Sequence, residues 1–212
     1  ANSYEKGIAE ANFMYNNCLK GKQFEYPIYI DVEDTHHQVN NLRGVTDAIK
    51  GFCETLENLG YYVGIYASDI SGFKDKMYIN ELTQYDKWVA SYSRVPIYVR
   101  GYGMWQFTSS GKIIGYDENL DVDISYKDYT SIMMCNGLNG YDKNFNDDFK
   151  VGDTVKIIST GNSSADGTGH NAYGIGWIRQ IIKIHENKEY PYQIGNEYGT
   201  TGFYKIGCIE KI

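Results

Sequence analysis

The fold is decided by Tyr26-Pro27-Ile28-Tyr29-Ile30-Asp31-Val32-Glu33-Asp34, an apolar run that ends in a cluster of acids. Aromatic and β-branched residues around the proline predict a β-strand that begins there. Side chains two residues apart in a strand point to the same side, so we expect Asp31 and Glu33 to share one face and Val32 to oppose them.

These two neighbouring acids carry the candidate chemistry. Like charges held side by side raise the proton affinity of one carboxyl. One carboxyl can then donate a proton while the other stays charged, which is the division of roles that glycoside hydrolysis needs. The competing interpretation is a solvated acidic loop after a strand. The acids end a buried-type strand, however, and open α/β folds and barrels place their sites there.

Composition excludes some function classes. The net charge is −7 and neither half of the chain has a basic stripe, so nucleic acid is not an expected partner. No apolar run approaches the length of a membrane span, so no membrane insertion is expected. The four cysteines lie far apart without a CxxC pair, which predicts free thiols. The 21 tyrosines suit carbohydrate stacking, although an A/T-rich coding bias explains them equally well.

Hydrophobic periodicity predicts alternating helices and strands in the first part of the chain. Helices are expected at 2–20, 44–59 and 69–77, and strands at 26–33, 61–68, 87–92, 104–109 and 120–125, with a turn at Ser110-Gly111. This order predicts an α/β fold, an abbreviated β/α barrel of the TIM type. A complete barrel needs roughly 250 residues, so we expect the barrel to be shortened or to begin upstream of residue 1.

A linker follows residue 134, and from Asp148 the character of the sequence changes. Residues 135–147 are polar and contain Gly and Asn, which predicts a linker. Short alternating strands with polar turns then follow, at 151–158, 176–184, 190–195 and 202–209. The expected domains are therefore an incomplete α/β barrel at 1–134 and a small all-β barrel at 148–212.

Five segments of the first domain resemble, in their order, the glycoside hydrolase family 25 muramidases of phage endolysins and bacterial autolysins. They are YPIYIDVED (26–34), GYYVGIYAS (60–68), DKWVASYS (86–93), YGMWQFTSSGKIIG (102–115) and LDVDISY (120–126). The second domain is similar to bacterial SH3-like cell-wall-binding modules in the segments FKVGDTVKII, GWIRQIIKI, YPYQIG and TTGFYKI.

The resemblance implies a lysozyme activity and the residues that perform it. The enzyme would cleave the β-1,4 bond between N-acetylmuramic acid and N-acetylglucosamine in peptidoglycan. The D-x-E motif of the family falls on Asp31 and Glu33, with Glu33 as the proton donor to the leaving sugar oxygen. The late acid falls on Asp121, with Asp123, which projects the same way, as the alternative. Positions of the substrate groove fall on Tyr66, Trp88, Tyr92 and Gln106.

Structural alternatives remain open for the aromatic candidates. Trp88 and Tyr92 share a strand face that forms either a sugar platform or barrel core. Trp177 and Tyr192 either line a wall-ligand groove of the small module or pack its interior.

A metal site is not expected. His36 and His37 stand beside acids, but adjacent side chains point apart, and no H-x-x-H or H-E-x-x-H spacing is present. We therefore expect the reaction to need neither a metal nor another cofactor.

One departure from the family leads to a rival hypothesis. The family begins with a strand that bears an aspartate, upstream of the helix expected at 2–20, and no segment here matches that strand. We therefore expect an N-terminally truncated form, and the alternative function is a non-catalytic cell-wall-binding protein or accessory subunit. The expected partners are bacterial peptidoglycan and a second copy or a full-length form that closes the barrel. The expected place of action is the bacterial cell wall, after secretion or phage release.

Overall fold

The computed structural model describes residues 2–33, 41–92, 94–141, 149–185, 188 and 190–212. The chain divides into two compact units, residues 1–128 and 129–212. The boundary precedes residue 134, the expected end of the first domain, because α3 (Tyr129–Asn136) packs within the second unit. Met133 of this helix is fully buried, and Asn136 accepts a hydrogen bond from Lys205 at 3.2 Å. The linker expected at 135–147 therefore begins inside a helix, and its residues 142–147 lie outside the described part.

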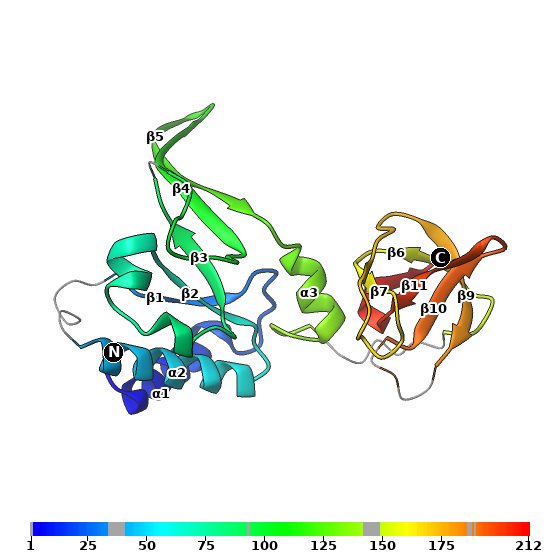
Figure 1. Cartoon of the computed structure of the whole chain (residues 1–212), viewed down its shortest axis with the longest axis horizontal. Coiled ribbons are helices and arrows are strands. Elements are labelled where there is room, and N and C mark those ends of the chain that lie inside the picture. Colours follow the sequence, from blue (N-terminus) through cyan, green and yellow to red (C-terminus); the bar gives the residue numbers. More distant parts are fainter. Residues whose placement is uncertain (1, 34–40, 93, 142–148, 186–187, 189) are drawn as a thin grey trace. The chain divides into compact units, whose positions relative to one another are not determined.

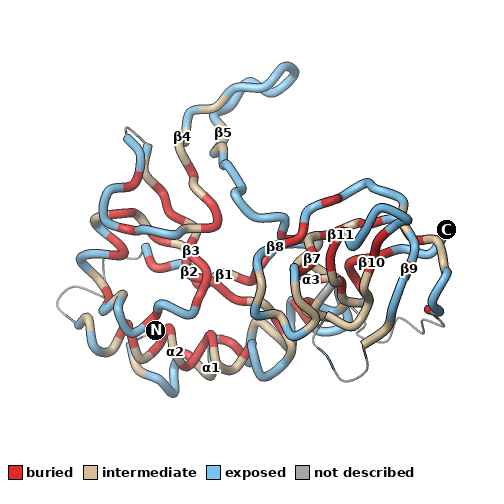
Figure 2. The backbone as a smooth tube through the Cα atoms, turned by 45° about the vertical axis from the view of Figure 1, so that its right-hand side comes forward, coloured by how far each residue is buried: buried red, intermediate tan, exposed pale blue. Residues whose placement is uncertain are grey.

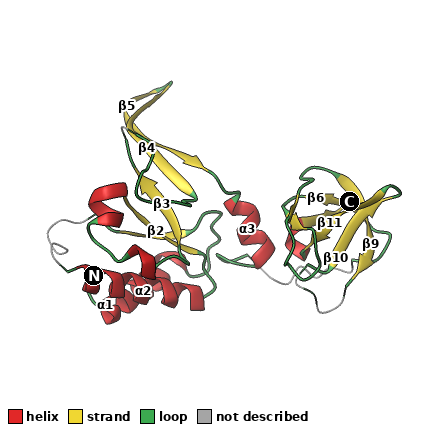
Figure 3. Ribbon diagram, viewed as in Figure 1, coloured by secondary structure: helices red, strands yellow, loops and turns green. Residues whose placement is uncertain are grey.

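The first unit is a mixed α/β structure, which confirms the fold class predicted for it (Figures 1 and 3). Its strands lie in the order β1-β2-β3-β4-β5, with the first four parallel and β5 antiparallel to β4. The elements in chain order are α1 (Tyr4–Met14), the π-helical η1 (Tyr15–Leu19), β1 (Ile28–Asp31), α2 (Leu42–Asn58), β2 (Val63–Ser68), the π-helical η2 (Asp69–Lys74), the 3-10 turn η3 (Ile79–Glu81), β3 (Asp86–Ala90), β4 (Met104–Ile113) and β5 (Tyr116–Ser125).

Burial alternates along the strands and separates the two faces of this sheet. Ile28, Ile30 and Val32 are buried in one core with the apolar side of α2. Figure 2 shows buried stretches in red in the strands and in α2. Because neighbouring strand residues point to opposite sides, Tyr29 and Asp31 face away from that core. The helical side of the sheet therefore provides stability, and the other face carries the candidate site.

Two glycines bring helices α1 and α2 into backbone contact. A Cβ atom added to Gly7 would clash with the carbonyl oxygen of Ala48, and one added to Gly51 would clash with the carbonyl oxygen of Tyr4. Interiors are packed too tightly to absorb such overlaps. The helix pair therefore depends on the absence of side chains at these two positions.

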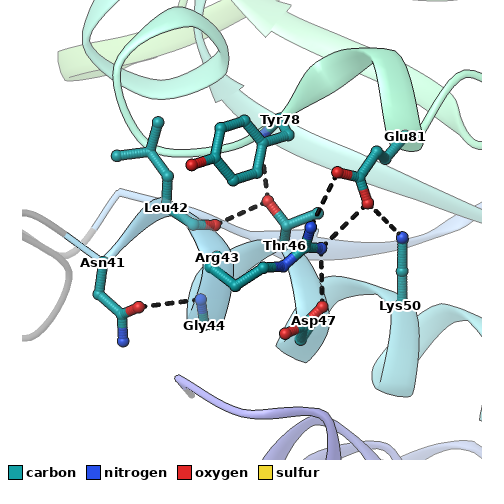
Figure 4. A network of polar contacts seen from close by, with 9 residues as sticks. All are labelled: Asn41, Leu42, Arg43, Gly44, Thr46, Asp47, Lys50, Tyr78 and Glu81. Atoms are coloured by element: carbon teal, nitrogen blue, oxygen red, sulfur yellow. Dashed lines mark hydrogen bonds and ion pairs between the residues drawn. The ribbon is translucent and has the colours of Figure 1, made fainter.

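A surface ion network ties η3 to α2 (Figure 4). Arg43 donates to both carboxylate oxygens of Glu81, at 2.8 and 3.0 Å, and to Asp47 at 2.7 Å. Lys50 donates to Glu81 at 2.6 Å. Hydrogen bonds from these two cations lower the pKa of Glu81 to about 2. The network fixes the segment that leads into β3.

Strands β4 and β5 form a longer hairpin than the sequence predicts. The turn expected at Ser110-Gly111 is wrong, because both residues lie within β4 and the chain reverses at Ile114-Gly115. Gly115 has a φ of +89°, which glycine adopts without strain. Gly111 has a different role: it lies at a register shift, where a Cβ would clash with Val122. Among the described residues, β4 beyond Gln106 pairs with β5 alone, and Figure 2 shows the tip exposed.

The second unit is mostly β-structure, arranged as one seven-stranded sheet in the order β12-β6-β9-β10-β11-β7-β8. Its core includes Val155, Ile157, Ile181, Ile194 and Tyr204. Similarity to an SH3-like barrel stays a prediction. The strands are β6 (Thr154–Ile157), β7 (Gly161–Asn162), β8 (Asn171–Ala172), β9 (Ile178–Ile184), β10 (Tyr192–Asn196), β11 (Gly199–Tyr204) and β12 (Ile209–Lys211), with the 3-10 turn η4 (Ile206–Cys208) before the last.

The cysteines correct part of the sequence analysis. Cys18 and Cys53 are free thiols, as predicted. Cys208 is disulfide-bonded, so the prediction of a free thiol is wrong for this residue. Cysteines far apart in sequence pair when the fold brings their Cβ atoms together, which spacing alone does not indicate.

Candidate active site

The expected site residues of the first unit meet on the sheet face that α1 and α2 do not cover. Asp31 of β1 pairs in register with Tyr66 of β2, and Tyr66 with Trp88 of β3. One layer further along, Gln106 of β4 pairs with Asp123 of β5. Since β1 to β4 are parallel, their carboxyl ends lie along one edge, which we call the carboxyl edge. Residues from all five strands therefore converge there.

Three aromatic rings line this face next to one another. The Tyr29 ring lies directly over Gly64, where any Cβ would collide with it, and so crosses β2 towards β3. Its centroid is 5.3 Å from that of Trp88 in an edge-on arrangement, and Tyr66 approaches Trp88 to 4.6 Å. Tyr29 was not among the expected site residues, although its position two residues before Asp31 places it on the same strand face.

Trp88 also fixes one acid of the β5 pair. Its indole Nε1–H donates to the Asp123 carboxylate at 2.6 Å. Burial is the main cause that raises the pKa of Asp123, and the charge of Asp121 adds to it, while the bond from Trp88 acts in the opposite direction. Asp121 lies two residues nearer the hairpin turn. The structure thus places Asp123, the alternative position for the late acid, in direct contact with the aromatic wall.

Two tyrosine hydroxyls converge on Gln106. Tyr66 and Tyr92 each donate to its Oε1 atom at 2.8 Å, and the Gln106 side chain is only 3% exposed. Burial is the largest cause that raises the pKa of both tyrosines, and the charge of Glu33 raises both as well. Tyr92 is in addition close enough to the β5 acids, Asp121 among them, for their charges to raise its pKa. An acid that follows β1 and the acids of β5 therefore act on one hydroxyl.

The D-x-E pair at the end of β1 has the predicted alternation of buried and exposed residues. Val32 is 2% exposed, and its N–H donates to the carbonyl oxygen of Tyr66 at 3.0 Å, whereas Asp31 and Glu33 are exposed. The pKa of Asp31 is raised, first by burial and then by the charge of Glu33, while Lys76 opposes the shift. The two carboxylates thus interact as neighbours on one side of the chain.

Lys76 is a neighbour of this pair that the sequence analysis missed. Its Nζ donates to the backbone oxygen of Glu33 at 2.7 Å, and its charge lowers the pKa of Asp31. No motif spans the distance in sequence between Lys76 and the acids, so only the fold reveals the contact. The lysine therefore fixes the backbone at Glu33, just after the end of β1.

A hollow opens beside Trp88 and Asp123. Its volume is about 380 Å³, and its lining is Tyr26, Pro27, Tyr29, Trp88, Met104 and Asp123. Apolar walls with one acid suit a sugar ring, whose faces are apolar and whose rim is polar. The hollow can therefore take a saccharide, with Asp123 as the acid in its lining.

Metals and membranes find no support in the described residues. These residues contain no group of three His, Cys, Asp or Glu placed to hold a metal ion. His36 and His37 lie outside the described part of the chain. No described helix is both long and apolar enough to cross a membrane.

The two aromatic candidates of the second unit do not come together. Trp177 is 51% exposed, with the guanidinium of Arg179 4.6 Å above its ring. Tyr192 is half-buried and packs edge-on against Phe149 at 5.1 Å. Trp177 precedes β9, while Tyr192 pairs with Ile184 at the other end of that strand. About 20 Å of strand separates them at roughly 3.3 Å per residue.

Comparison with known proteins gives a family match and structural neighbours. The model of the glycosyl hydrolases family 25 matches residues 1–116. A family 25 glycosyl hydrolase from Bacillus anthracis is 29% identical with a TM-score of 0.50, over 59% of this chain and 61% of that one. The CTP1L endolysin is 23% identical with a TM-score of 0.52, over 63% of this chain and 46% of that one. The chain thus covers about half the length of these proteins. No curated protein sequence matches it.

Proposed function

The chain belongs to the glycosyl hydrolases family 25, and from this membership we propose that it hydrolyses peptidoglycan at the β-1,4 bond between N-acetylmuramic acid and N-acetylglucosamine. The observation that carries the proposal is that Asp31, Tyr66 and Trp88 lie in register on one sheet face, where Trp88 donates to Asp123 at 2.6 Å. The charges of Glu33, Asp121 and Asp123 all raise the pKa of Tyr92 on the same side. The similarity to an endolysin and to a family 25 enzyme supports the choice of a wall glycan as the substrate.

Glu33 is the proposed general acid. It lies just beyond the last residue of β1, and its backbone is held by Lys76 at 2.7 Å. From there its carboxyl can protonate the oxygen of the leaving sugar, a contribution typically worth about 10²–10⁴-fold in rate. Asp31, whose pKa is raised, shares this side of the chain and orients the sugar beside it.

Asp123, rather than Asp121, is our assignment for the acid that stabilises positive charge at the anomeric carbon. The 2.6 Å bond from Trp88 aims the Asp123 carboxylate at the face that carries the hollow, which Asp123 itself lines. In one mechanism this carboxylate attacks the anomeric carbon, and in the other it orients the substrate's acetamido group for that attack. Both mechanisms use the carboxylate at the same place.

The aromatic and amide residues bind the substrate in this proposal. Tyr66 and Trp88 offer ring surfaces to the sugar, and aromatic side chains pair such apolar surface with polar tips. Tyr92 and Gln106 belong to the hydrogen-bonded group next to them. A groove built in this way holds the reacting bond between the two acid pairs.

The second unit is proposed to hold the enzyme on the bacterial cell wall as an SH3-like module. Trp177 is the better contact residue, because it is exposed beside Arg179. Tyr192 packs against Phe149, which favours the interpretation that it stabilises the unit. The protein would therefore act at the wall.

The test of this function is the chemistry of the new sugar ends. Purified peptidoglycan is incubated with the chain, reduced with borohydride and hydrolysed. Cleavage at the proposed bond yields N-acetylmuramitol. Glu33→Gln should form this product about 10²–10⁴-fold more slowly than wild type. Asp123→Asn should lose more activity than Asp121→Asn, which serves as its matched control. Release of N-acetylglucosaminitol instead would refute the bond assignment.

The rival hypothesis of a non-catalytic wall-binding protein gives a different result. The protein would then sediment with cell walls without producing any new reducing end. Glu33→Gln would leave the sedimented fraction of the protein unchanged. Appearance of muramitol ends from the chain by itself would eliminate this rival.

A further inference from the structure

The segment Arg94-Val95-Pro96-Ile97-Tyr98-Val99-Arg100, which we call the 94–100 loop, borders the carboxyl edge of the first unit. It follows Tyr92 in the connection that leaves β3. Ser91 donates through its Oγ to the backbone oxygen of Arg94 at 2.8 Å, which holds the start of the loop at the end of that strand. The loop therefore begins where the proposed glycan groove lies.

A buried carboxylate fixes the middle of the loop. Asp69, directly after β2, is 3% exposed and accepts the backbone N–H groups of Ile97, Tyr98 and Val99 at 2.9 to 3.3 Å. The Val99 side chain is fully buried in the core. A carboxylate that is buried must be compensated by donors, and these three amides provide the compensation. The loop is therefore held at the carboxyl edge of β2 in one conformation.

The rigid loop exposes apolar side chains between two cations. Val95 is 57% exposed, Ile97 51% and Tyr98 39%. Arg94 and Arg100 at the two ends are exposed, and neither guanidinium pairs with any carboxylate among the described residues. The third arginine of this unit, Arg43, is by contrast bound to Glu81 and Asp47.

The charge of the loop is opposite to that of its surroundings. Residues 1–128 carry 12 Lys and Arg against 18 Asp and Glu, yet the loop has two arginines and no acid. Arginine binds carboxylates through a planar fork of donors. An ordered surface of this kind loses little entropy on binding. Its chemistry fits a short acidic segment with small apolar side chains.

We propose that the 94–100 loop is an accessory binding site for the acidic stem peptide of the wall glycan, with Arg94 and Arg100 bound to its free carboxylates. This inference rests on the proposed function, since the glycan strand in the groove is what brings a stem peptide to the loop. Stem peptides combine carboxylates with alanine side chains, which matches both the arginines and the apolar residues between them. An anionic phosphate polymer would leave Val95, Ile97 and Tyr98 without apolar contacts.

The arginine side chains give a direct readout. The whole chain has four arginines, so a ¹⁵N NMR spectrum contains four Nε–Hε signals. The probe is a disaccharide tetrapeptide with free carboxylates, and the matched ligands are its amidated form and the peptide-free disaccharide. The signals of Arg94 and Arg100 should shift with the acidic ligand alone, while that of Arg43 stays in place.

Affinity measured on variants completes the test. Arg94→Gln with Arg100→Gln should weaken binding of the acidic ligand by about four- to twentyfold, since exposed ion pairs contribute modestly. Lys20→Gln with Lys22→Gln, the same change of charge in the segment before β1, should have no such effect. The peptide-free disaccharide should bind all of these proteins equally.

Three results would overturn the inference. These are equal shifts with the amidated ligand, unchanged affinity in the double arginine variant, or a response of the two signals to a glycerol phosphate polymer but not to the peptide. Failure of the proposed hydrolysis looks different. In that case no muramitol end appears from the glycan, while the carboxylate-dependent shifts of Arg94 and Arg100 persist.

Discussion

At the scale of single residues, Trp88 links the aromatic wall to the acids. Its ring packs against those of Tyr29 and Tyr66, and its N–H donates to Asp123 at 2.6 Å. The sequence left two roles open for Trp88, a sugar platform or barrel core. The structure shows a third one, because a hydrogen bond to a carboxylate both orients it and favours its charged form.

Replacing Trp88 should change the titration of Asp123. Trp88→Phe keeps an aromatic ring but removes the donor, so the pKa of Asp123 should rise, since that bond is what lowers it. The ¹³C chemical shift of the Asp123 carboxyl, followed against pH, measures this directly. Trp105→Phe is the matched control, because the Trp105 indole donates to the backbone oxygen of Ser91. An unchanged titration of Asp123 in Trp88→Phe would contradict the assignment.

The raised pKa of Asp31 should appear in the stability of the first unit. The folded state holds this proton more tightly than the unfolded state, so stability falls as pH rises from about 4, the ordinary pKa of aspartate. Asp31→Asn removes that loss. The free energy of unfolding of the variant, relative to wild type, should therefore increase with pH above this value.

Urea titrations across the acid range measure this difference. Asp75→Asn, at an exposed aspartate after η2, is the control for the loss of one carboxylate. If the advantage of Asp31→Asn instead grew as pH fell, the sign of the shift would be wrong.

The sequence predicted the strand faces of the candidate residues better than their contacts. Asp31, Tyr66 and Gln106 lie on expected strands and face one side, and Glu33 follows two residues after the end of β1. Period-two alternation explains this placement, because it fixes the face of every strand residue once one is known. Contacts between distant segments, such as that of Lys76 with Glu33, have no local signal.

At the scale of elements, close approach of α1 and α2 determines how the helical layer forms. Gly51→Ala raises helix propensity by about 1 kcal/mol, yet the new methyl group would collide with the backbone of α1. We expect a net destabilisation of about 1–3 kcal/mol, the usual cost of overpacking. Hydrogen exchange of α1 and α2 peptides measures it.

A matched control separates the clash from helix propensity. Asn12 is exposed on α1, and its side-chain amide donates to the backbone oxygen of Ile8 in the same helix. Asn12→Ala removes this bond within one helix. The free energy of unfolding of this variant should stay within about 0.5 kcal/mol of the wild-type value. A stabilised Gly51→Ala variant would show that the helices separate at no cost.

The turn of the β4–β5 hairpin shows where reasoning from local sequence failed. Ser110-Gly111 has the composition of a turn, but Ile114-Gly115 forms it. Composition suggests a turn wherever Gly follows a polar residue. The cross-strand register selects among such places, and it depends on β5, which the local pattern does not include.

At the scale of the whole molecule, the two units differ in how they are stabilised. The first has a core of strands and helices and two free cysteines, and the second is smaller and contains the disulfide-bonded Cys208. The sequence indicated the change of character near residue 148. It did not indicate that α3 belongs to the second unit, because its short apolar run reads as the end of the first.

Reduction should therefore weaken one unit and leave the other unchanged. Dithiothreitol should destabilise residues 129–212 by about 2–5 kcal/mol, the usual effect of losing a native disulfide in a small domain. Hydrogen exchange of the intact chain, with and without the reductant, reports both units in one sample. Protection in β1, β2 and α2 should stay constant. An equal loss of protection from hydrogen exchange in both units would contradict the assignment of the disulfide to the second unit.

The β4–β5 hairpin beyond Gln106 has a consequence for how such sequences diverge. Among the described residues, β4 and β5 pair only with each other in this part of the ladder. Its length can therefore change without disturbing the parallel strands. An insertion of one residue in one strand would exchange its two faces, whereas matched additions keep every side chain on its own side. Homologues should therefore lengthen or shorten this arm in even steps, unless a new bulge absorbs the odd residue.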